Sequence, residues 1–392
     1  MKTTDIIYLD NAATTRLSPA VLDAMLPYLN DCYGNPSSLY SLGRQSQTAI
    51  TKAREEIAQS LNCDKREIYF TGGGSESNNW AIKTAAAILA ESGTLAKKHI
   101  ISSEFEHHAA LHVLETLQKT GFEVTLLPVY KDGRVRVADL EKALRPDTGL
   151  VTIMHANNEI GTIQPIAEIG AVCHERGVWL HTDAAQSVGK IPVDIAALNV
   201  DFLTISGHKI HAAKGVGALY INKRIKFGSL IQGGGQERGL RAGTENVAGI
   251  VGLGVAVREA VDGLEAVTER LLTLRQKLCD GIVKIEKSHL NGSLQNRLPS
   301  NLNFSFEGIE GEALLLHLDL AGICCSSGSA CTSGSLDPSH VLLALGLPHE
   351  IAHGSLRITT SKYTTDAEID RFLEVLPGVV GRLREMSPLW NK

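Results

Sequence analysis

The chain has 392 residues, of which 43% are hydrophobic and 21% are charged, and its formal net charge at pH 7 is -5. This balance is typical of a soluble globular protein and gives no reason to expect nucleic acid or an anionic membrane as a partner. The most apolar stretch, residues 311–325, contains charged residues and is too short to cross a bilayer, and the N-terminus shows no export signal. We therefore expect a cytoplasmic protein without membrane contact.

Short apolar runs alternate with longer segments of helical periodicity over most of the chain. Predicted strands cover residues 67–74, 99–108, 150–159, 177–186, 200–209 and 217–221. Predicted helices between them cover residues 75–92, 109–121 and 166–177. This alternation predicts an α/β fold, in which helices flank both faces of a mainly parallel sheet.

The pattern changes near residue 260, where a long amphipathic segment leads into sparser strands and a final helix at 366–386. We predict a large α/β domain at residues 17–260 and a smaller C-terminal α+β domain at residues 261–392. Residues 1–16 are expected to join the two domains. The seven cysteines are scattered and include no C-x-x-C pair, which argues against a disulfide framework and a cysteine zinc site.

Three glycines follow the first long predicted strand, in "FTGGGSESNNW". Glycines let backbone N–H groups approach an anion closely, and the N-terminus of the next helix adds its positive end. Gly74 and Ser75 are therefore candidates for binding a phosphate. The spacing is not that of a P-loop, and a tight turn alone would explain the glycines equally well.

Asp183 and Lys209 end two successive predicted strands. A lysine at a buried strand end is costly unless it is neutral or covalently used. One explanation is a partly buried ion pair. The other is pyridoxal phosphate, for which a lysine forms the Schiff base and a carboxylate pairs with the pyridinium nitrogen. The upstream phosphate loop is the third part that this cofactor needs, so the combination favours the cofactor.

Histidines and one cysteine complete the candidate chemistry. His107 and His108 end another predicted strand, and either could stack on a flat ring and transfer protons. His208 and His211 lack the carboxylate spacing of a metal site, so no resident metal is expected. Cys331 lies in "SSGSACTSGS", where small polar neighbours and glycines favour mobility over packing. The following "LDPSHVLLAL" predicts a helix with Asp337 as its cap and Pro338 in its first turn.

Nearly the whole chain, from Tyr8 to about Trp390, resembles the cysteine desulfurases, and more narrowly their NifS/IscS group. The motifs that carry the resemblance are "YLDNAATT", "HANNEIGTIQPI", "HTDAAQSVGKI", "SGHKIHAAKGVG", "GGGQERGLRAGTEN" and "SSGSACTSGSLDPSHVL". Tyr40 departs from the pattern, because relatives often have histidine there. The resemblance implies a homodimeric, pyridoxal-phosphate-dependent enzyme of the class-V aminotransferase family, with the fold of type I.

The resemblance also implies a role for each candidate residue of the cofactor site. Lys209 would hold the cofactor, Asp183 its pyridine nitrogen and Gln186 its ring hydroxyl. His107 would stack on the ring, which favours it over His108. The phosphate would be bound by Gly74, Ser75, Ser206 and His208, and by Thr244 reaching across to the partner subunit's site.

For the substrate, the resemblance implies that Asn157 and Arg357 bind the carboxylate of L-cysteine. Lys209 would take the Cα proton, with help from His107 in moving protons. The thiolate of Cys331 would attack the substrate sulfur, which forms a persulfide and releases L-alanine. An iron–sulfur scaffold or another acceptor protein would then receive the sulfur, with Cys331 in transient contact with the cluster.

Several alternatives remain open at this stage. An aminotransferase or a selenocysteine lyase would use the same cofactor, and a sulfur-carrier module would need none. Cys324 and Cys325 lie in an apolar run beside Cys331, where burial is favoured over a sulfur-relay role. The sequence does not distinguish nitrogenase clusters, general iron–sulfur assembly and tRNA thiolation as destinations of the sulfur.

Overall fold

A seven-stranded sheet forms the centre of the larger part of the computed structural model, which describes residues 6–91, 97–327, 338–388 and 390. Its strand order is β2 (Ile68–Thr71), β8 (Gly217–Ile221), β7 (Phe202–Ser206), β6 (Trp179–Asp183), β5 (Thr148–Thr152), β3 (His99–Ser103) and β4 (Glu123–Leu127). Strand β8 is antiparallel to both of its neighbours, and the remaining pairs are parallel. The predicted mainly parallel sheet is therefore confirmed.

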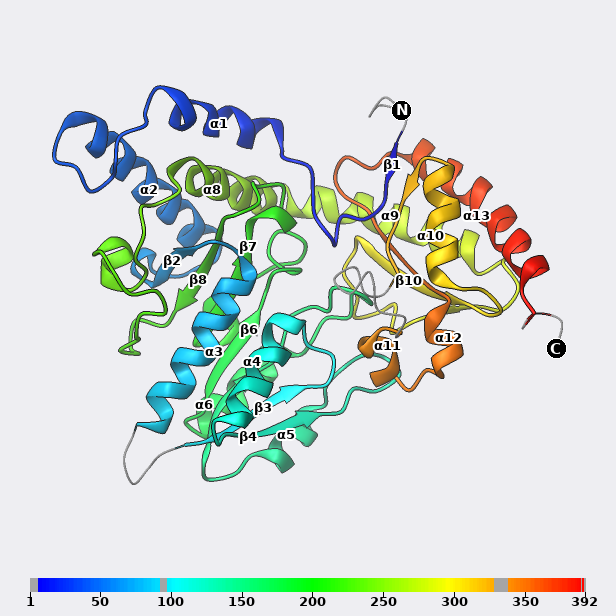
Figure 1. Cartoon of the computed structure of the whole chain (residues 1–392), viewed down its shortest axis with the longest axis horizontal. Coiled ribbons are helices and arrows are strands. Elements are labelled where there is room, and N and C mark those ends of the chain that lie inside the picture. Colours follow the sequence, from blue (N-terminus) through cyan, green and yellow to red (C-terminus); the bar gives the residue numbers. More distant parts are fainter. Residues whose placement is uncertain (1–5, 92–96, 328–337, 389, 391–392) are drawn as a thin grey trace.

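Helices cover both faces of this sheet (Figure 1). One face packs against α3 (Gly74–Ala90) and α4 (His108–Lys119). The other face packs against α2 (Ser41–Ser60), α5 (Val137–Ala143), α6 (Ile166–Glu175), α7 (Ile195–Leu198) and α8 (Val247–Asp262). Helix α1 (Pro19–Asn30) lies beyond α8 and buries only Val21 and Met25.

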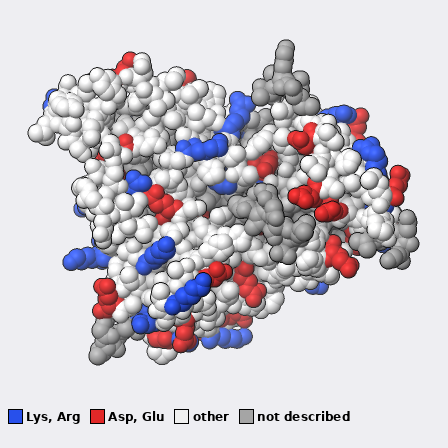
Figure 2. Space-filling view, in the orientation of Figure 1, with Lys and Arg blue, Asp and Glu red and all other residues white. Residues whose placement is uncertain are grey.

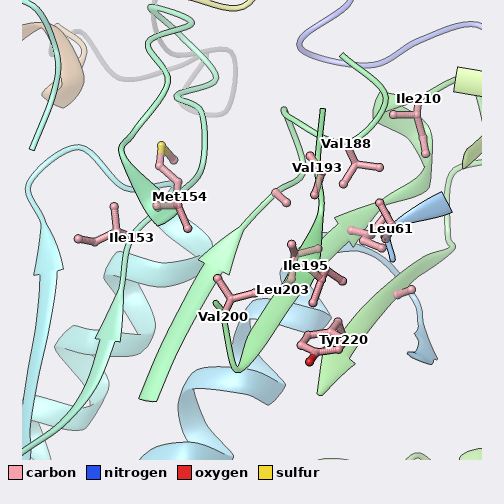
Figure 3. Close-up of a cluster of buried hydrophobic side chains, with 14 of the residues drawn as sticks. Leu61, Ile153, Met154, Val188, Val193, Ile195, Val200, Leu203, Ile210 and Tyr220 are labelled. Carbon is pink, nitrogen blue, oxygen red and sulfur yellow. The ribbon is translucent and has the colours of Figure 1, made fainter. Parts of the chain in front are cut away.

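Alternation along the strands explains why the sheet needs cover on both sides. In β7, Phe202 belongs to the core beneath α3 and α4, whereas the next residue, Leu203, belongs to the core on the opposite face. Successive side chains of a strand point to opposite faces of the sheet, so a strand that is apolar throughout must be covered on both faces. Figure 3 shows part of the second core, with Leu61, Ile153, Met154, Val188, Val193, Ile195, Val200, Leu203, Ile210 and Tyr220.

The remaining elements surround a separate apolar cluster, which includes Leu9 and residues from Leu271 to Leu383. A three-stranded antiparallel sheet has the order β12 (Ser355–Thr359), β10 (Asn301–Phe306) and β9 (Ser288–Leu290). Helices α9 (Leu264–Ile282), α10 (Gly311–Leu320) and α13 (Asp366–Met386) pack into this apolar cluster. Helix α12 (His349–His353) contacts β10, but its buried residue Ala352 belongs to the core of the large sheet. Strand β1 (Ile7–Tyr8) pairs in parallel with β11 (Ile323–Cys324), so the start of the chain lies beside these C-terminal elements (Figure 1).

The boundary between the two predicted domains at residue 261 stays a prediction. Helix α11 (His340–Ala344) contributes Val341 and Leu342 to the core of the large sheet, although it follows that boundary. The cap of α11 is Ser339, whose hydroxyl accepts hydrogen bonds from the backbone N–H groups of Val341 and Leu342. The predicted cap, Asp337, lies outside the described residues. Within the described part of the chain, no helix is long and apolar enough to cross a membrane.

Candidate active site

The carboxyl ends of the parallel strands open onto a cavity of about 700 Å³. This is the edge at which open parallel sheets bind their ligands. The cavity also reaches the N-terminal segment, the start of α11 and strand β12. Nine of the predicted site residues line it: Gly74, Ser75, His107, Asp183, Gln186, Ser206, His208, Lys209 and Arg357. Residues far apart in the sequence thus meet in one hollow.

The glycine-rich loop joins β2 to α3 at one end of the cavity. Gly73 has φ of 149°, a conformation that side chains rarely permit. A Cβ atom added at Gly217 would lie 2.8 Å from the Cα of Gly73, so the loop depends on a glycine in β8 as well. The first N–H groups of α3 have no partner within the helix, and with the helix dipole they make this end suited to a phosphate.

Asp183 is the last residue of β6, and Lys209 lies in the short 3₁₀ turn that follows the neighbouring strand β7. The two carboxylate oxygens of Asp183 accept hydrogen bonds from Asn78 Nδ2 at 2.6 Å and from the Ala185 N–H at 2.9 Å. Lys209 Nζ donates to the carbonyls of Ala12 and Ala13 at 2.6 and 2.8 Å. Both groups are therefore held in fixed positions on the cavity wall.

Gln186 shares one of the lysine's acceptors. Its Nε2 donates to the Ala12 carbonyl at 3.0 Å, and its Oε1 accepts from Lys190 Nζ at 2.7 Å. Burial is the main cause that lowers the pKa of Lys190 to about 7, and the positive charges of Lys209 and Arg357 add to the shift. The amide of Gln186 is thus held between Lys190 and the Ala12 carbonyl at the cavity wall.

His107 caps α4 at the cavity wall, and its Nδ1 accepts a hydrogen bond from the Ala109 N–H at 3.0 Å. Burial lowers the pKa of His107, while Asp183 opposes the shift and Lys209 adds to it. In the neutral ring the proton therefore resides on Nε2, which can act as a proton donor. Burial also lowers the pKa of His208, to about 4, and its Nδ1 contacts Thr14 Oγ1 at 3.1 Å.

Arg357 reaches the opposite wall from β12 and is almost fully buried. Its Nη2 donates to Asp10 Oδ1 at 2.8 Å, and its Nη1 donates to the Asn158 carbonyl at 3.1 Å. Its Nε has no hydrogen-bond partner among the described residues. A buried guanidinium with an unused donor beside a cavity is suited to binding a carboxylate.

Three predicted site residues do not line the cavity. The amide of Asn157 is used inside the fold: Nδ2 donates to the Phe105 carbonyl at 3.1 Å, and Oδ1 accepts from the Glu159 N–H at 2.8 Å. Thr244 is exposed on a loop outside its own chain's cavity. Cys331 lies outside the described residues.

Sequence reasoning missed two buried carboxyl groups near the site. Burial raises the pKa of Glu106 to about 8 and that of Glu159 to about 7. Glu106 accepts from Ser103 Oγ and the Met154 N–H, and Glu159 accepts from Ser339 Oγ. Glu159 lines the cavity together with Asn158, the neighbour of the predicted Asn157. The only sequence signal for Asn158 was the pair of adjacent asparagines. The pair does not show which of the two amides faces the cavity.

The arrangement fits pyridoxal phosphate. The hollow joins a helix N-terminus for the phosphate, a carboxylate held by two donors for the pyridine nitrogen, and a lysine amine for the aldehyde. Asn78 Oδ1, which belongs to the amide that orients Asp183, is buried without a partner among the described residues. The described residues contain no cluster of three or more histidine, cysteine or acidic side chains that could hold a metal ion.

Comparisons with known proteins point in one direction. The model of the aminotransferase class-V family matches residues 7–372. The cysteine desulfurase IscS of Clostridium botulinum is 52% identical over 388 residues, covering 98% of this chain and 97% of that protein. The cysteine desulfurase IscS of Methanosarcina thermophila is 52% identical over 386 residues, covering 98% of this chain and 95% of that protein.

Solved structures agree in fold over almost the whole chain. A NifS-like protein superposes with a TM-score of 0.91 at 39% identity, covering 96% of this chain and all of that one. A structure of SspA in complex with cysteine superposes with a TM-score of 0.80 at 39% identity, covering 92% of this chain and 100% of that one. The predicted fold of type I is therefore confirmed.

Proposed function

The chain belongs to the cysteine desulfurases of the aminotransferase class-V family, which use pyridoxal phosphate, and on this premise we propose that it moves sulfur from L-cysteine to Cys331 and onward to an acceptor protein. The observation that carries the proposal is the single cavity that joins Lys209, Asp183, His107 and Arg357. The solved SspA structure holds cysteine, which agrees with L-cysteine as the substrate here.

The cofactor would be held from several sides. Its phosphate would lie at the start of α3 near Ser75 and Ser206, its pyridine nitrogen at Asp183 and its ring hydroxyl at Gln186. When bound, pyridoxal phosphate supplies the electron sink that makes the substrate's Cα proton removable. Lys209 would anchor it and, once displaced by the substrate amine, would be the base nearest to that proton.

The substrate would be oriented by Arg357 and served by His107. The guanidinium would bind the carboxylate of L-cysteine through donors that Asp10 and the Asn158 carbonyl do not use. His107 is held neutral by burial, and its Nε2 can give or take a proton at the substrate sulfur. Proximity of the two groups across one cavity would fix which bond of the substrate reacts.

The sulfur-transfer step forms an S–S bond and breaks the Cβ–S bond of the substrate. The Cys331 thiolate attacks the substrate sulfur, the electron pair of the broken bond stays with the substrate carbon, and that carbon gains a proton. The products are a Cys331 persulfide and L-alanine, so the substrate carbon is reduced while the sulfur pair becomes a persulfide. No outside oxidant is needed. A thiolate is the reactive form of cysteine, so Cys331 would attack in its deprotonated form.

An iron–sulfur scaffold or another acceptor protein would take the sulfur from Cys331. Acidic side chains outnumber basic ones on the face over α10 and α13 (Figure 2). Glu312 and Asp319 of α10 are exposed. An acceptor with a basic surface would be steered toward such a face. We also propose that the active form is a homodimer, in which Thr244 reaches the partner subunit's phosphate site.

Mass spectrometry of the rapidly quenched enzyme tests this function. After one turnover with L-cysteine we expect one added sulfur on the peptide that contains Cys331 and an equal amount of L-alanine. The variants Cys324→Ser and Cys325→Ser serve as controls, because burial raises the pKa of both thiols and they should leave the label on Cys331. 3-Mercaptopyruvate in place of L-alanine would identify an aminotransferase, and pyruvate released with sulfide and ammonia would identify a β-eliminating lyase. Either product would contradict the proposal.

A further inference from the structure

Arg357 is paired with an acidic side chain, Asp10, that has no role in the proposed reaction. Asp10 lies just after β1, and its Oδ1 accepts the hydrogen bond from Arg357 Nη2 at 2.8 Å. Its other oxygen, Oδ2, accepts from Ser326 Oγ at 2.9 Å. The carboxylate therefore joins the buried guanidinium to the chain that follows β11. Asp10 itself does not line the cavity.

The backbone holds the Asp10–Arg357 pair in place from both sides. Two residues of β12 form isolated β-bridges to this region. Arg357 forms an antiparallel bridge with Ser326, and Thr359 forms a parallel bridge with Asp10. The Arg357 N–H donates to the Ser326 carbonyl at 2.7 Å. Asp10 is thus fixed beside β12 independently of its side chain, so its carboxylate can act as a rigid support for the guanidinium.

An arginine in this place needs such a support. Its side chain has several rotatable bonds, so its guanidinium is held in one plane only where fixed acceptors take some of its donors. Asp10 takes one Nη donor and the Asn158 carbonyl takes another, which leaves Nε without a partner among the described residues. The two bonds therefore fix the plane of the guanidinium, and a bound carboxylate would use its remaining donors.

We propose that Asp10 is a positioning residue for the substrate carboxylate, which acts by holding Arg357 in the orientation that binds it. The inference rests on the proposed role of Arg357 in substrate binding. Asp10 touches neither the substrate nor the cofactor, so its loss should weaken carboxylate recognition and leave the chemical steps almost unchanged.

Two variants at Asp10 separate orientation from simple destabilisation. Asp10→Asn keeps an oxygen that can accept from Arg357 Nη2, whereas Asp10→Ala removes it. For each holoenzyme we would measure the dissociation constant of L-alanine by spectral titration of the cofactor, together with KM and kcat for L-cysteine. Arg357→Ala gives the reference for lost carboxylate binding, and melting temperatures report any loss of folding.

We expect Asp10→Ala to raise the L-alanine dissociation constant and the KM for L-cysteine by roughly tenfold, as for one lost charge-assisted hydrogen bond, with little change in kcat. Asp10→Asn should stay within about threefold of the unmodified protein, because it keeps the acceptor. Equal L-alanine binding by Asp10→Ala and the unmodified protein would overturn the inference, as would equally weak binding by both Asp10 variants. If Arg357→Ala also bound L-alanine normally, the proposed substrate orientation itself would be wrong.

Discussion

His107 shows how a single side chain is prepared for its proposed task. The Ala109 N–H occupies Nδ1, and burial lowers the pKa of the ring, so that His107 is neutral at pH 7 with its proton on Nε2. We predict that His107→Gln lowers kcat for L-cysteine by about 10²–10⁴-fold, the usual contribution of a general acid–base group. Because protonation of His107 should stop turnover, we expect the pH profile of kcat to show an acid limb in the unmodified protein, at a pH below the ordinary pKa of histidine, and to lose it in His107→Gln. A variant that kept this limb would assign it to another group.

Glu106 makes stability depend on pH. Burial raises its pKa from 4.5 to about 8, so its contribution to stability is complete below about pH 4.5 and is lost as the pH rises through about 8. We predict that Glu106→Gln, which keeps an acceptor for Ser103 and Met154, removes this loss of at most about 1.4 kcal/mol per pH unit. Urea unfolding at pH 5, 7 and 8.5 measures the difference. Glu115→Gln, at an exposed site on α4, is the matched control and should change the slope little.

At this scale the sequence predicted residue types better than side-chain directions. Asp183 and Lys209 were predictable because parallel strands bring their carboxyl ends to one edge, and both line the cavity. The direction of the Asn157 side chain was not predictable from the sequence. Its amide accepts from the Glu159 N–H, and its neighbour Asn158 lines the cavity instead. The state of Glu106 was also hidden, because burial is a property of the packed fold and not of the local sequence.

The contact between strand β8 and the glycine-rich loop sets the shape of the cavity at the start of α3. Gly217 in β8 packs directly against the glycine-rich loop, and a Cβ there would lie 2.6 Å from the Ile205 carbonyl oxygen. We predict that Gly217→Ala pushes the strand and the loop apart, costs about 1–3 kcal/mol of stability and speeds the release of the cofactor. Gly378→Ala in α13 is the control, because an added Cβ there meets nothing within 4 Å and should stabilise the helix. Equal cofactor release by the two variants would contradict this account.

The strands and helices predicted around the large sheet are present in the structure. The sequence did not predict the cap of α11, which is Ser339. Strands buried on both faces give continuous apolar runs, which identify them without knowledge of their neighbours. The helix after the Cys331 segment begins at His340 with Ser339 as its cap, because the Ser339 hydroxyl can accept from two N–H groups of the first turn. Asp337 was predicted as the cap with Pro338 in the first turn, whereas Pro338 precedes the cap Ser339. Asp, Pro and Ser all favour helix starts, so residue type alone is a weak guide to the exact cap.

For the whole molecule, an exposed apolar face on α1 supports the proposed homodimer. Leu22, Leu26 and Leu29 recur at helical spacing and are exposed, whereas Val21 and Met25 on the other side are buried. We predict that Leu29→Asp shifts the protein toward monomers in sedimentation experiments and lowers turnover, because Thr244 could no longer reach the partner's phosphate site. Val283→Asp, at a similarly exposed site after α9, should remain a dimer. Monomeric unmodified protein with full turnover would contradict the proposed dimer.

The most direct test of the account combines the absorbance spectrum of the purified protein with its products from L-cysteine. We predict a yellow protein that makes equal amounts of L-alanine and transferable sulfur. Lys209→Ala should lose the spectrum of the lysine-bound cofactor, and Cys331→Ala should keep that spectrum but fail to pass on sulfur. Turnover with sulfur transfer that is unchanged in Cys331→Ala would contradict the central claim that this thiol receives the sulfur.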